Sequence, residues 1–309
     1  MANEEVFKRY SGNPIVGPSD LPGANSIFNS AVLKYGKGYV GVFRVDMQNE
    51  AHELHTGWSD DGINWRIEPK RIAITGAVPK GKPAGLGYDP RVTKIGNTYY
   101  VTWCYYPESS GPSIGLGATK DFKKYKQLTT IMLPFNRNAV LFPRKIGGRY
   151  AVLHRPSDTG HTPFGDMFYA DSPDLISWGN HKFVFGPNGW WQGSKVGAGP
   201  VPIETKEGWL VIYHGVRITC SGFVYCAGAA LLDLKQPWKV MYRTKRYLLA
   251  PTEPYETTGD VPNVVFPNAA IVDDKTGRLD LYYGCADTCV GLAQAQLSDV
   301  IRFVKKNSF

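Results

Sequence analysis

The sequence lacks the features that would direct it to a membrane, a secretory route or nucleic acid. No apolar run is long enough to cross a bilayer. The first ten residues carry acids at Glu4 and Glu5 and have neither the basic start nor the apolar centre of a signal peptide. The net charge is +8, yet Lys and Arg are scattered in runs no longer than pairs such as Lys123-Lys124. We therefore expect a cytoplasmic protein that binds neither membrane nor nucleic acid.

Cysteine is scarce as well. The five cysteines are odd in number and lack the paired spacing of metal ligands; they are Cys104, Cys220, Cys226, Cys285 and Cys289. This pattern predicts free thiols in a reducing compartment rather than disulfides, and no metal site.

The sequence contains one pattern that is repeated five times. Each copy has an apolar strand, a tight glycine turn and a second, aromatic-rich strand. The turns and second strands occupy residues 36–44, 96–104, 147–155, 208–214 and 277–284. A repeat of this period built only from strands is typical of a radial fold. We therefore expect an all-β protein, a five-bladed β-propeller formed as a single domain by residues 1–309, with a central active-site pocket.

The repeat also sets the approximate blade boundaries. The blades are predicted at 26–75, 86–130, 136–185, 195–250 and 262–309, with residues 1–25 leading into the ring. An aspartate in the turn after the third strand is expected to cap that turn in four blades, at Asp60, Asp121, Asp174 and Asp233. Two inserts, residues 76–86 and 157–166, are expected to border the pocket because long polar loops on a rigid ring commonly do.

The first strand of each blade should line the axis of the ring. Asn29, Asp89 and Arg137 stand at related points in the first strands of three blades. The sequence therefore predicts that Asn, Asp and Arg side chains meet in one small space.

Cationic side chains gather at related positions of the repeat. Four of them are expected to form one positive cluster: Arg137, Arg155, Lys195 and His214. Burying four uncompensated cations is costly, so such a cluster requires a dianion such as phosphate, whose oxygens suit the arginine fork. The alternative is that each cation pairs separately with a carboxylate of its own blade.

Few carboxylates are expected near the central pocket. Asp89 is the one carboxylate at the start of an inner strand, and Asp287 follows the second strand of blade five. An inverting glycosidase needs two carboxylates, an acid and a base that activates water. A phosphorolytic enzyme needs only the acid, because cations hold phosphate in line with the anomeric carbon. One central acid and a cation cluster fit the second arrangement better.

Several motifs then match a known family in order along nearly the whole chain. They are residues 29–31, 87–91, 135–143, 154–157, 160–166, 197–200, 213–216 and 282–287. Together they resemble glycoside hydrolase family 130, the β-mannoside phosphorylases, and look closest to the members acting on β-1,4-linked mannosides such as mannosyl-N-acetylglucosamine and mannooligosaccharides.

The resemblance implies a role for each candidate residue. Asp89 would be the catalytic acid, delivering its proton through the mannose 3-hydroxyl, and the four cations would bind phosphate. Substrate-binding residues would be Asn29, Ser30, Arg44, Tyr88, His161, Asp166, Tyr225 and Asp287. The resemblance implies no metal or organic cofactor, with inorganic phosphate as co-substrate and a β-mannoside as the other small-molecule partner. Relatives are often oligomers, so we expect a homo-oligomer.

Other functions fit the same fold. A β-mannoside hydrolase of the β-1,2-mannosidase type would lack the phosphate cations, whereas all four positions are cationic here. A β-1,2-mannoside phosphorylase would differ only in linkage. A non-catalytic sugar-binding propeller would repeat its site in every blade, whereas the polar residues here differ between blades.

Overall fold

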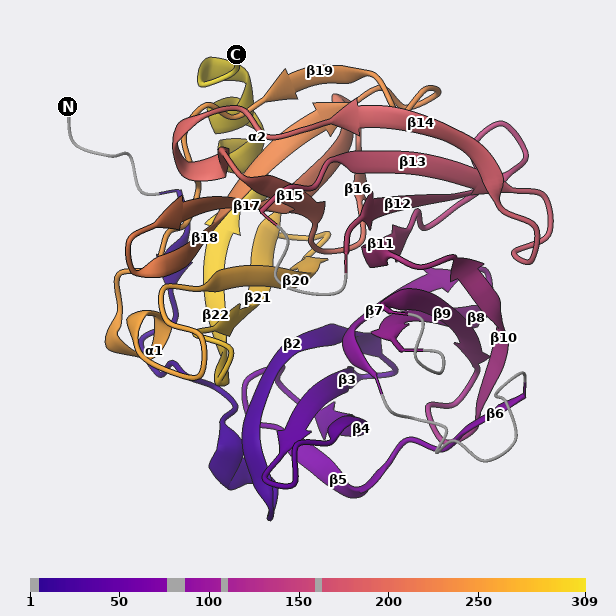
Figure 1. The fold of residues 1–309 in the computed structure, drawn as a ribbon, viewed down its shortest axis with the longest axis vertical. Helices are drawn as coiled ribbons and strands as arrows, with labels where there is room; N and C mark the ends of the chain where they lie inside the picture. The colour runs from indigo at the N-terminus through magenta and orange to yellow at the C-terminus, as the bar shows by residue number, and fades with distance from the viewer. Residues whose placement is uncertain (1–5, 77–86, 107–110, 159–162) are drawn as a thin grey trace.

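Five sheets stand around a common centre, as Figure 1 shows. The structure is a computed structural model that describes residues 6–76, 87–106, 111–158 and 163–309. The expected all-β five-bladed propeller is confirmed. No helix in the described ranges is long and apolar enough to span a membrane.

Each sheet is one blade, and its strands run antiparallel from the axis outward except for β6 at the edge of blade two. Blade one contains β2 (Ala24–Tyr35), β3 (Gly38–Met47), β4 (His52–Ser59) and β5 (Arg66–Arg71). Blade two contains β7 (Tyr88–Ile95), β8 (Thr98–Tyr105), β9 (Ser113–Thr119) and β10 (Tyr125–Met132), with β6 (Ile74–Gly76) parallel to β10. Blade three contains β11 (Asn136–Leu141), β12 (Tyr150–Pro156), β13 (Met167–Ser172) and β14 (Gly179–Phe185).

The last two blades are less regular. Blade four contains β15 (Lys195–Ala198), β17 (Gly208–Thr219), β18 (Gly222–Leu232) and β19 (Val240–Arg243), and β16 (Ile203–Thr205) also pairs with β17. Blade five contains β20 (Val265–Val272), β21 (Arg278–Cys285), β22 (Cys289–Gln296) and β1 (Lys8–Arg9). In the described residues the α-helices are α1 (Pro254–Thr257) and α2 (Leu297–Lys306), and two short 3₁₀ helices lie at Pro18–Asp20 and Trp190–Gln192.

The ring is closed by the beginning of the chain, which corrects the predicted blade five. Residues 262–309 supply only three of its strands, and the remainder of that segment forms α2. The fourth strand is β1, which pairs antiparallel with β22 through Lys8–Gln294 and Arg9–Ala293. Residues predicted only to lead into the ring therefore complete it.

Every pair of neighbouring blades shares an apolar core. For example, Val42 of blade one and Val101 of blade two belong to one buried cluster, and Ile212 of blade four and Leu281 of blade five belong to another. Full burial of a side chain of this size contributes roughly 1.5–3 kcal/mol. The blades are thus held face to face by their alternating apolar residues.

The predicted aspartate turns are confirmed in three blades and shifted in one. The carboxylates of Asp121, Asp174 and Asp233 each accept backbone N–H bonds from the residues two and three positions later. In blade one this acceptor is Asp61 and not Asp60. These carboxylates serve the turns, so they are not candidates for catalysis.

Candidate active site

Three inner strands carry the same irregularity near the point where they reach the site. In β2, β7 and β11 two residues face a single residue of the neighbouring strand, which is a β-bulge. The first bulged residue is left-handed in each case, with φ of 45° at Asn29, 50° at Asp89 and 54° at Asn138. Asn and Asp tolerate this conformation better than other residues with a side chain. The bulge therefore explains why these residue types occur here.

This register corrects one prediction. Asn29 and Asp89 do occupy related positions, but the equivalent residue of blade three is Asn138, and Arg137 stands one position earlier. Arg137 instead pairs with Arg155 across the ladder, as Tyr88 pairs with Cys104. The one-residue shift follows from the pairing of β11 with β12, which places the bulge at Asn138 and Ala139 and leaves Arg137 before it.

A cavity of about 270 Å³ opens at this end of the ring. Its wall includes nine of the predicted site residues: Asn29, Arg44, Tyr88, Asp89, Arg137, Arg155, Lys195, Tyr225 and Asp287. Four further residues complete it: His52, Tyr106, Asn138 and Phe266. Residues from all five blades thus contribute to one asymmetric site.

Asp89 is held by polar side chains of blade one. Its Oδ1 accepts hydrogen bonds from Asn29 Nδ2 and Arg44 Nη1, both at 2.9 Å. Arg44 is itself fixed by a two-pronged ion pair with Asp46, at 2.9 and 2.8 Å, and its guanidinium lies 4.1 Å from the Phe28 ring centroid. The position of the Asp89 carboxyl is therefore determined by a rigid network.

Arg91 forms hydrogen bonds with the backbone of the bulge that contains Asp89. This buried guanidinium donates to the backbone carbonyls of Asp89 at 3.2 Å and Pro90 at 3.1 Å, and to Gly199 of blade four at 2.6 Å. Burial lowers the pKa of Arg91 to about 10. Arg91 thus joins blades two and four beneath the site and fixes the backbone that presents Asp89.

Asp287 is the second carboxyl of the cavity. Burial raises the pKa of Asp287 to about 7, and the nearby Asp89 adds to this rise although Arg44 opposes it. At neutral pH Asp287 is therefore partly protonated and can both donate and accept hydrogen bonds, which suits a ligand rich in hydroxyl groups.

The other side of the cavity is positive. Arg137 donates to Tyr88 Oη at 3.2 Å and to the carbonyl of Asp158 at 2.9 Å. Burial lowers the pKa of Lys195 to about 7, and the charges of Arg155 and Arg137 lower it further than Asp158 raises it. Within the described residues, Arg155 Nε has no hydrogen-bond partner. This excess of buried positive charge is what an anion would compensate.

His214 corrects the prediction of four cations. Its side chain is 0% exposed, and burial followed by the charges of Arg155, Arg91 and Lys195 holds its pKa well below the usual value. The neutral ring accepts a hydrogen bond from Arg155 Nη1 at Nε2, at 2.9 Å. His214 therefore lies behind the cavity wall and orients Arg155, and the cationic cluster consists of Arg137, Arg155 and Lys195.

The remaining predicted residues are placed differently. Ser30 is buried and donates to the Phe28 carbonyl at 3.1 Å. Asp166 lies just before β13 and outside the cavity wall. His161 and nearly all of the 76–86 insert lie outside the described residues.

Four wall residues were missed by the sequence analysis. Asn138 lies within the motif at residues 135–143 and Phe266 lies on an inner strand, so both belong to segments that the sequence analysis had singled out. Tyr106 and His52 lie at the end of a second strand and the start of a third strand, which the inner-strand argument did not cover. Only the closure of the ring brings those strand ends to the mouth.

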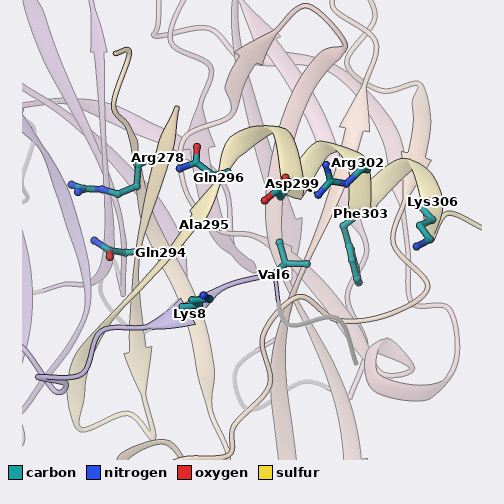
Figure 2. A pocket seen from close by; sticks show the side chains of 10 residues that line it. All are labelled: Val6, Lys8, Arg278, Gln294, Ala295, Gln296, Asp299, Arg302, Phe303 and Lys306. Carbon is teal, nitrogen blue, oxygen red and sulfur yellow. Dashed lines mark hydrogen bonds and ion pairs between the residues drawn. The ribbon is translucent and has the colours of Figure 1, made fainter. Parts of the chain in front are cut away.

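A larger hollow, of about 390 Å³, lies on the outer side of blade five between β1, β22 and α2 (Figure 2). Its charged residues include Arg278 and Arg302, which pair with Asp280 and Asp299. None of the predicted site residues belongs to it. The central cavity, with its unbalanced charge and convergent polar groups, is the better candidate active site.

Comparison with known proteins points to one group of enzymes. The model of glycoside hydrolase family 130, described as β-1,4-mannooligosaccharide phosphorylase, matches residues 6–306. A β-1,4-mannooligosaccharide phosphorylase of Ruminococcus albus is 52% identical over 99% of this chain and 92% of its own. A 1,2-β-oligomannan phosphorylase of a Thermoanaerobacter species is 36% identical over 95% of this chain and 98% of its own.

A solved structure extends the similarity to three dimensions. The β-1,2-mannobiose phosphorylase from Listeria innocua, in complex with β-1,2-mannobiose, superposes with a TM-score of 0.85 at 29% identity. The alignment covers 97% of this chain and 99% of that one. The propeller and its strand order are therefore shared over essentially the whole length.

Proposed function

This chain belongs to glycoside hydrolase family 130, and we propose that it is an inverting β-mannoside phosphorylase, an enzyme of the glycosyltransferase type. Inorganic phosphate cleaves a β-mannoside and gives α-D-mannose 1-phosphate and the shortened acceptor sugar. The observation that carries the proposal is the division of one cavity into an acid held by Asn29 and Arg44 and a cluster of under-compensated cations.

In the proposed reaction, phosphate binds to Arg137, Arg155 and Lys195, with His214 holding Arg155 in place. A phosphate oxygen attacks the anomeric carbon from the face opposite the leaving sugar, and the glycosidic C–O bond breaks. Asp89 supplies the proton that the leaving oxygen takes up, relayed through the mannose 3-hydroxyl. The cations stabilise phosphate in the attacking position, so no second carboxylate is needed as a base.

Mannose itself is proposed to bind between Asp89 and the cationic cluster. Asn29, Arg44 and Asp287 line this part of the cavity and offer donors and acceptors to its hydroxyl groups. Tyr88 and Tyr225 provide aromatic surface near the leaving sugar. The reaction needs no metal or organic cofactor, because the proton and the nucleophile come from Asp89 and phosphate.

We propose the β-1,4 linkage, because the Ruminococcus relative that shares 52% identity is named for it. The β-1,2 linkage is the second candidate, since relatives at 36% and 29% identity carry that name. Phosphorolysis of β-1,4-mannobiose and β-1,2-mannobiose in parallel separates the two.

The proposal also includes the cellular compartment and the oligomeric state of the enzyme. Cys285 and Cys289 face each other in the β21–β22 register as free thiols, which fits a reducing cytoplasm. We also propose assembly into a homo-oligomer, as the resemblance to the family implies.

Two substitutions test the proposed roles. Asp89→Asn keeps a residue suited to the left-handed backbone and removes the acid, so we expect turnover to fall at least ~100-fold, the usual contribution of a general acid, with the thermal midpoint little changed. Arg155→Met is expected to raise KM for phosphate far more than KM for the mannoside. Both constants are measured by steady-state kinetics of mannose 1-phosphate release.

Asp299→Asn, on the exposed side of α2, is the matched control and should keep wild-type activity. Full activity of Asp89→Asn would exclude that residue as the acid. Release of free mannose by Arg155→Met at the wild-type rate would indicate a hydrolase instead.

A further inference from the structure

His52 lies in the wall of the cavity but has no part in the proposed binding of phosphate or mannose. It begins β4 at the outer end of blade one, and 46% of its side chain is exposed. It therefore stands at the mouth of the cavity, whereas Asp89, with 11% of its side chain exposed, lies deeper.

The ring of His52 is held in a fixed position. Its Nδ1 lies 2.8 Å from Asp46 Oδ1, and its ring is tilted against that of Tyr88 with centroids 5.9 Å apart. Although burial raises the pKa of Asp46, hydrogen bonds from His52 and Arg44 lower it to about 2. Asp46 is therefore an ionised acceptor, and His52 must donate its Nδ1 proton to it.

This contact determines what the other ring nitrogen can do. With the Nδ1 proton directed at Asp46, Nε2 is the ring nitrogen that is left to form a hydrogen bond with a ligand. Among the described residues, the side chain of His52 has no hydrogen bond or ion pair other than the one with Asp46. A fixed ring nitrogen at the wall of a polar cavity is suited to a hydroxyl group of a ligand, which can both donate and accept a hydrogen bond.

The positions of the two sugars along the cavity indicate which of them carries this hydroxyl group. Mannose must lie deep, where its anomeric carbon can reach both Asp89 and the cations. The leaving sugar then lies on the face opposite phosphate and extends toward the mouth. His52 is tied to Asp89 through Asp46 and Arg44, so it lies on the acid side of the cavity.

We propose that His52 is a specificity-determining residue whose Nε2 forms a hydrogen bond with a hydroxyl group of the leaving sugar. The assignment rests on the proposed phosphorylase activity. In the reverse reaction the same contact recognises the acceptor sugar, so affinity for the acceptor measures it directly.

The test compares three substitutions in the reverse reaction, from α-mannose 1-phosphate with mannose as acceptor. His52→Leu removes both nitrogens and should raise KM for the acceptor about 3- to 10-fold, the range of one net hydrogen bond. His52→Gln places an acceptor oxygen near the Nε2 position and should restore much of the affinity. His52→Asn keeps only a group near the Nδ1 position and should behave like His52→Leu. KM for phosphate in the forward reaction should stay within twofold of the wild type in all three.

Glu50→Gln, on the exposed turn before β4 and outside the cavity wall, is the matched control and should match the wild type. Wild-type acceptor KM in His52→Leu, or rescue by Asn rather than Gln, would overturn the assignment and reduce His52 to a support for Asp46. A wild-type protein without phosphate-dependent turnover would instead overturn the proposed function and this assignment with it.

Discussion

Single residues of this site owe their charge to burial as much as to residue type. Lys195 and Asp287 both have pKa values shifted to about 7, in opposite directions from their usual values, and His214 is kept neutral. The sequence identified all three positions but treated His214 as a cation. Residue type alone could not reveal its state, because desolvation and the neighbouring charges of Arg155 and Arg91 arise only in the folded ring.

The shifted pKa of Lys195 predicts a pH-dependent anion site. As pH rises from 6 to 8.5, Lys195 loses its proton through a pKa of about 7 and Asp287 gains negative charge over the same range. Arg155, with a pKa of about 10, stays charged. Binding of sulfate, whose charge is constant, should therefore weaken about 10-fold, as expected for loss of one charged hydrogen bond. Isothermal titration across this pH range measures it.

Lys195→Arg retains its charge at high pH, so its sulfate affinity should change less with pH than that of the wild type, with the residual slope due to Asp287. An identical slope in both proteins would show that Lys195 does not contact the anion.

At the scale of elements, the alternation of strands and turns was predictable and the irregular pieces were not. Glycine turns and aromatic strands marked the five blades because each turn requires special backbone angles and each strand buries one face. The bulges at Asn29, Asp89 and Asn138, and the two-residue strand β1, have no periodic signal of their own. They follow from how the inner strands curve and from which edge remains open when the ring closes.

Strand β1 is predicted to contribute more to stability than its length suggests. Phe7, beside it, is fully buried in the core shared by blades four and five, and Arg9 pairs with the buried Glu256 at 2.8 Å. Phe7→Ala should lower the free energy of unfolding by about 3–5 kcal/mol, the usual cost of truncating a buried phenylalanine. Denaturant unfolding followed by fluorescence measures this change.

Phe183→Ala is the control, because Phe183 is exposed on β14 and its loss should change stability by less than about 0.5 kcal/mol. Equal effects of the two substitutions would argue that β1 does not close the ring.

At the scale of the whole molecule, the propeller brings distant parts of the chain to one end of the axis. Asn29, Asp89, Arg137, Lys195 and Asp287 come from five different blades and line one cavity. The sequence predicted this convergence because these residues lie in inner strands or just after a second strand, at points that the repeat brings to one end of the axis. The hollow between β1, β22 and α2 (Figure 2) has no such relation to the repeat, and its Arg278 and Arg302 pair with the neighbouring Asp280 and Asp299.

The central claim is that phosphate, held by the cations of this cavity, is the nucleophile. The most direct measurement is ³¹P and ¹H NMR of the wild-type protein incubated with β-1,4-mannobiose, with and without inorganic phosphate. The account predicts α-mannose 1-phosphate and free mannose in equal amounts when phosphate is present, and no cleavage when it is absent. Cleavage to free mannose alone in phosphate-free buffer would contradict it.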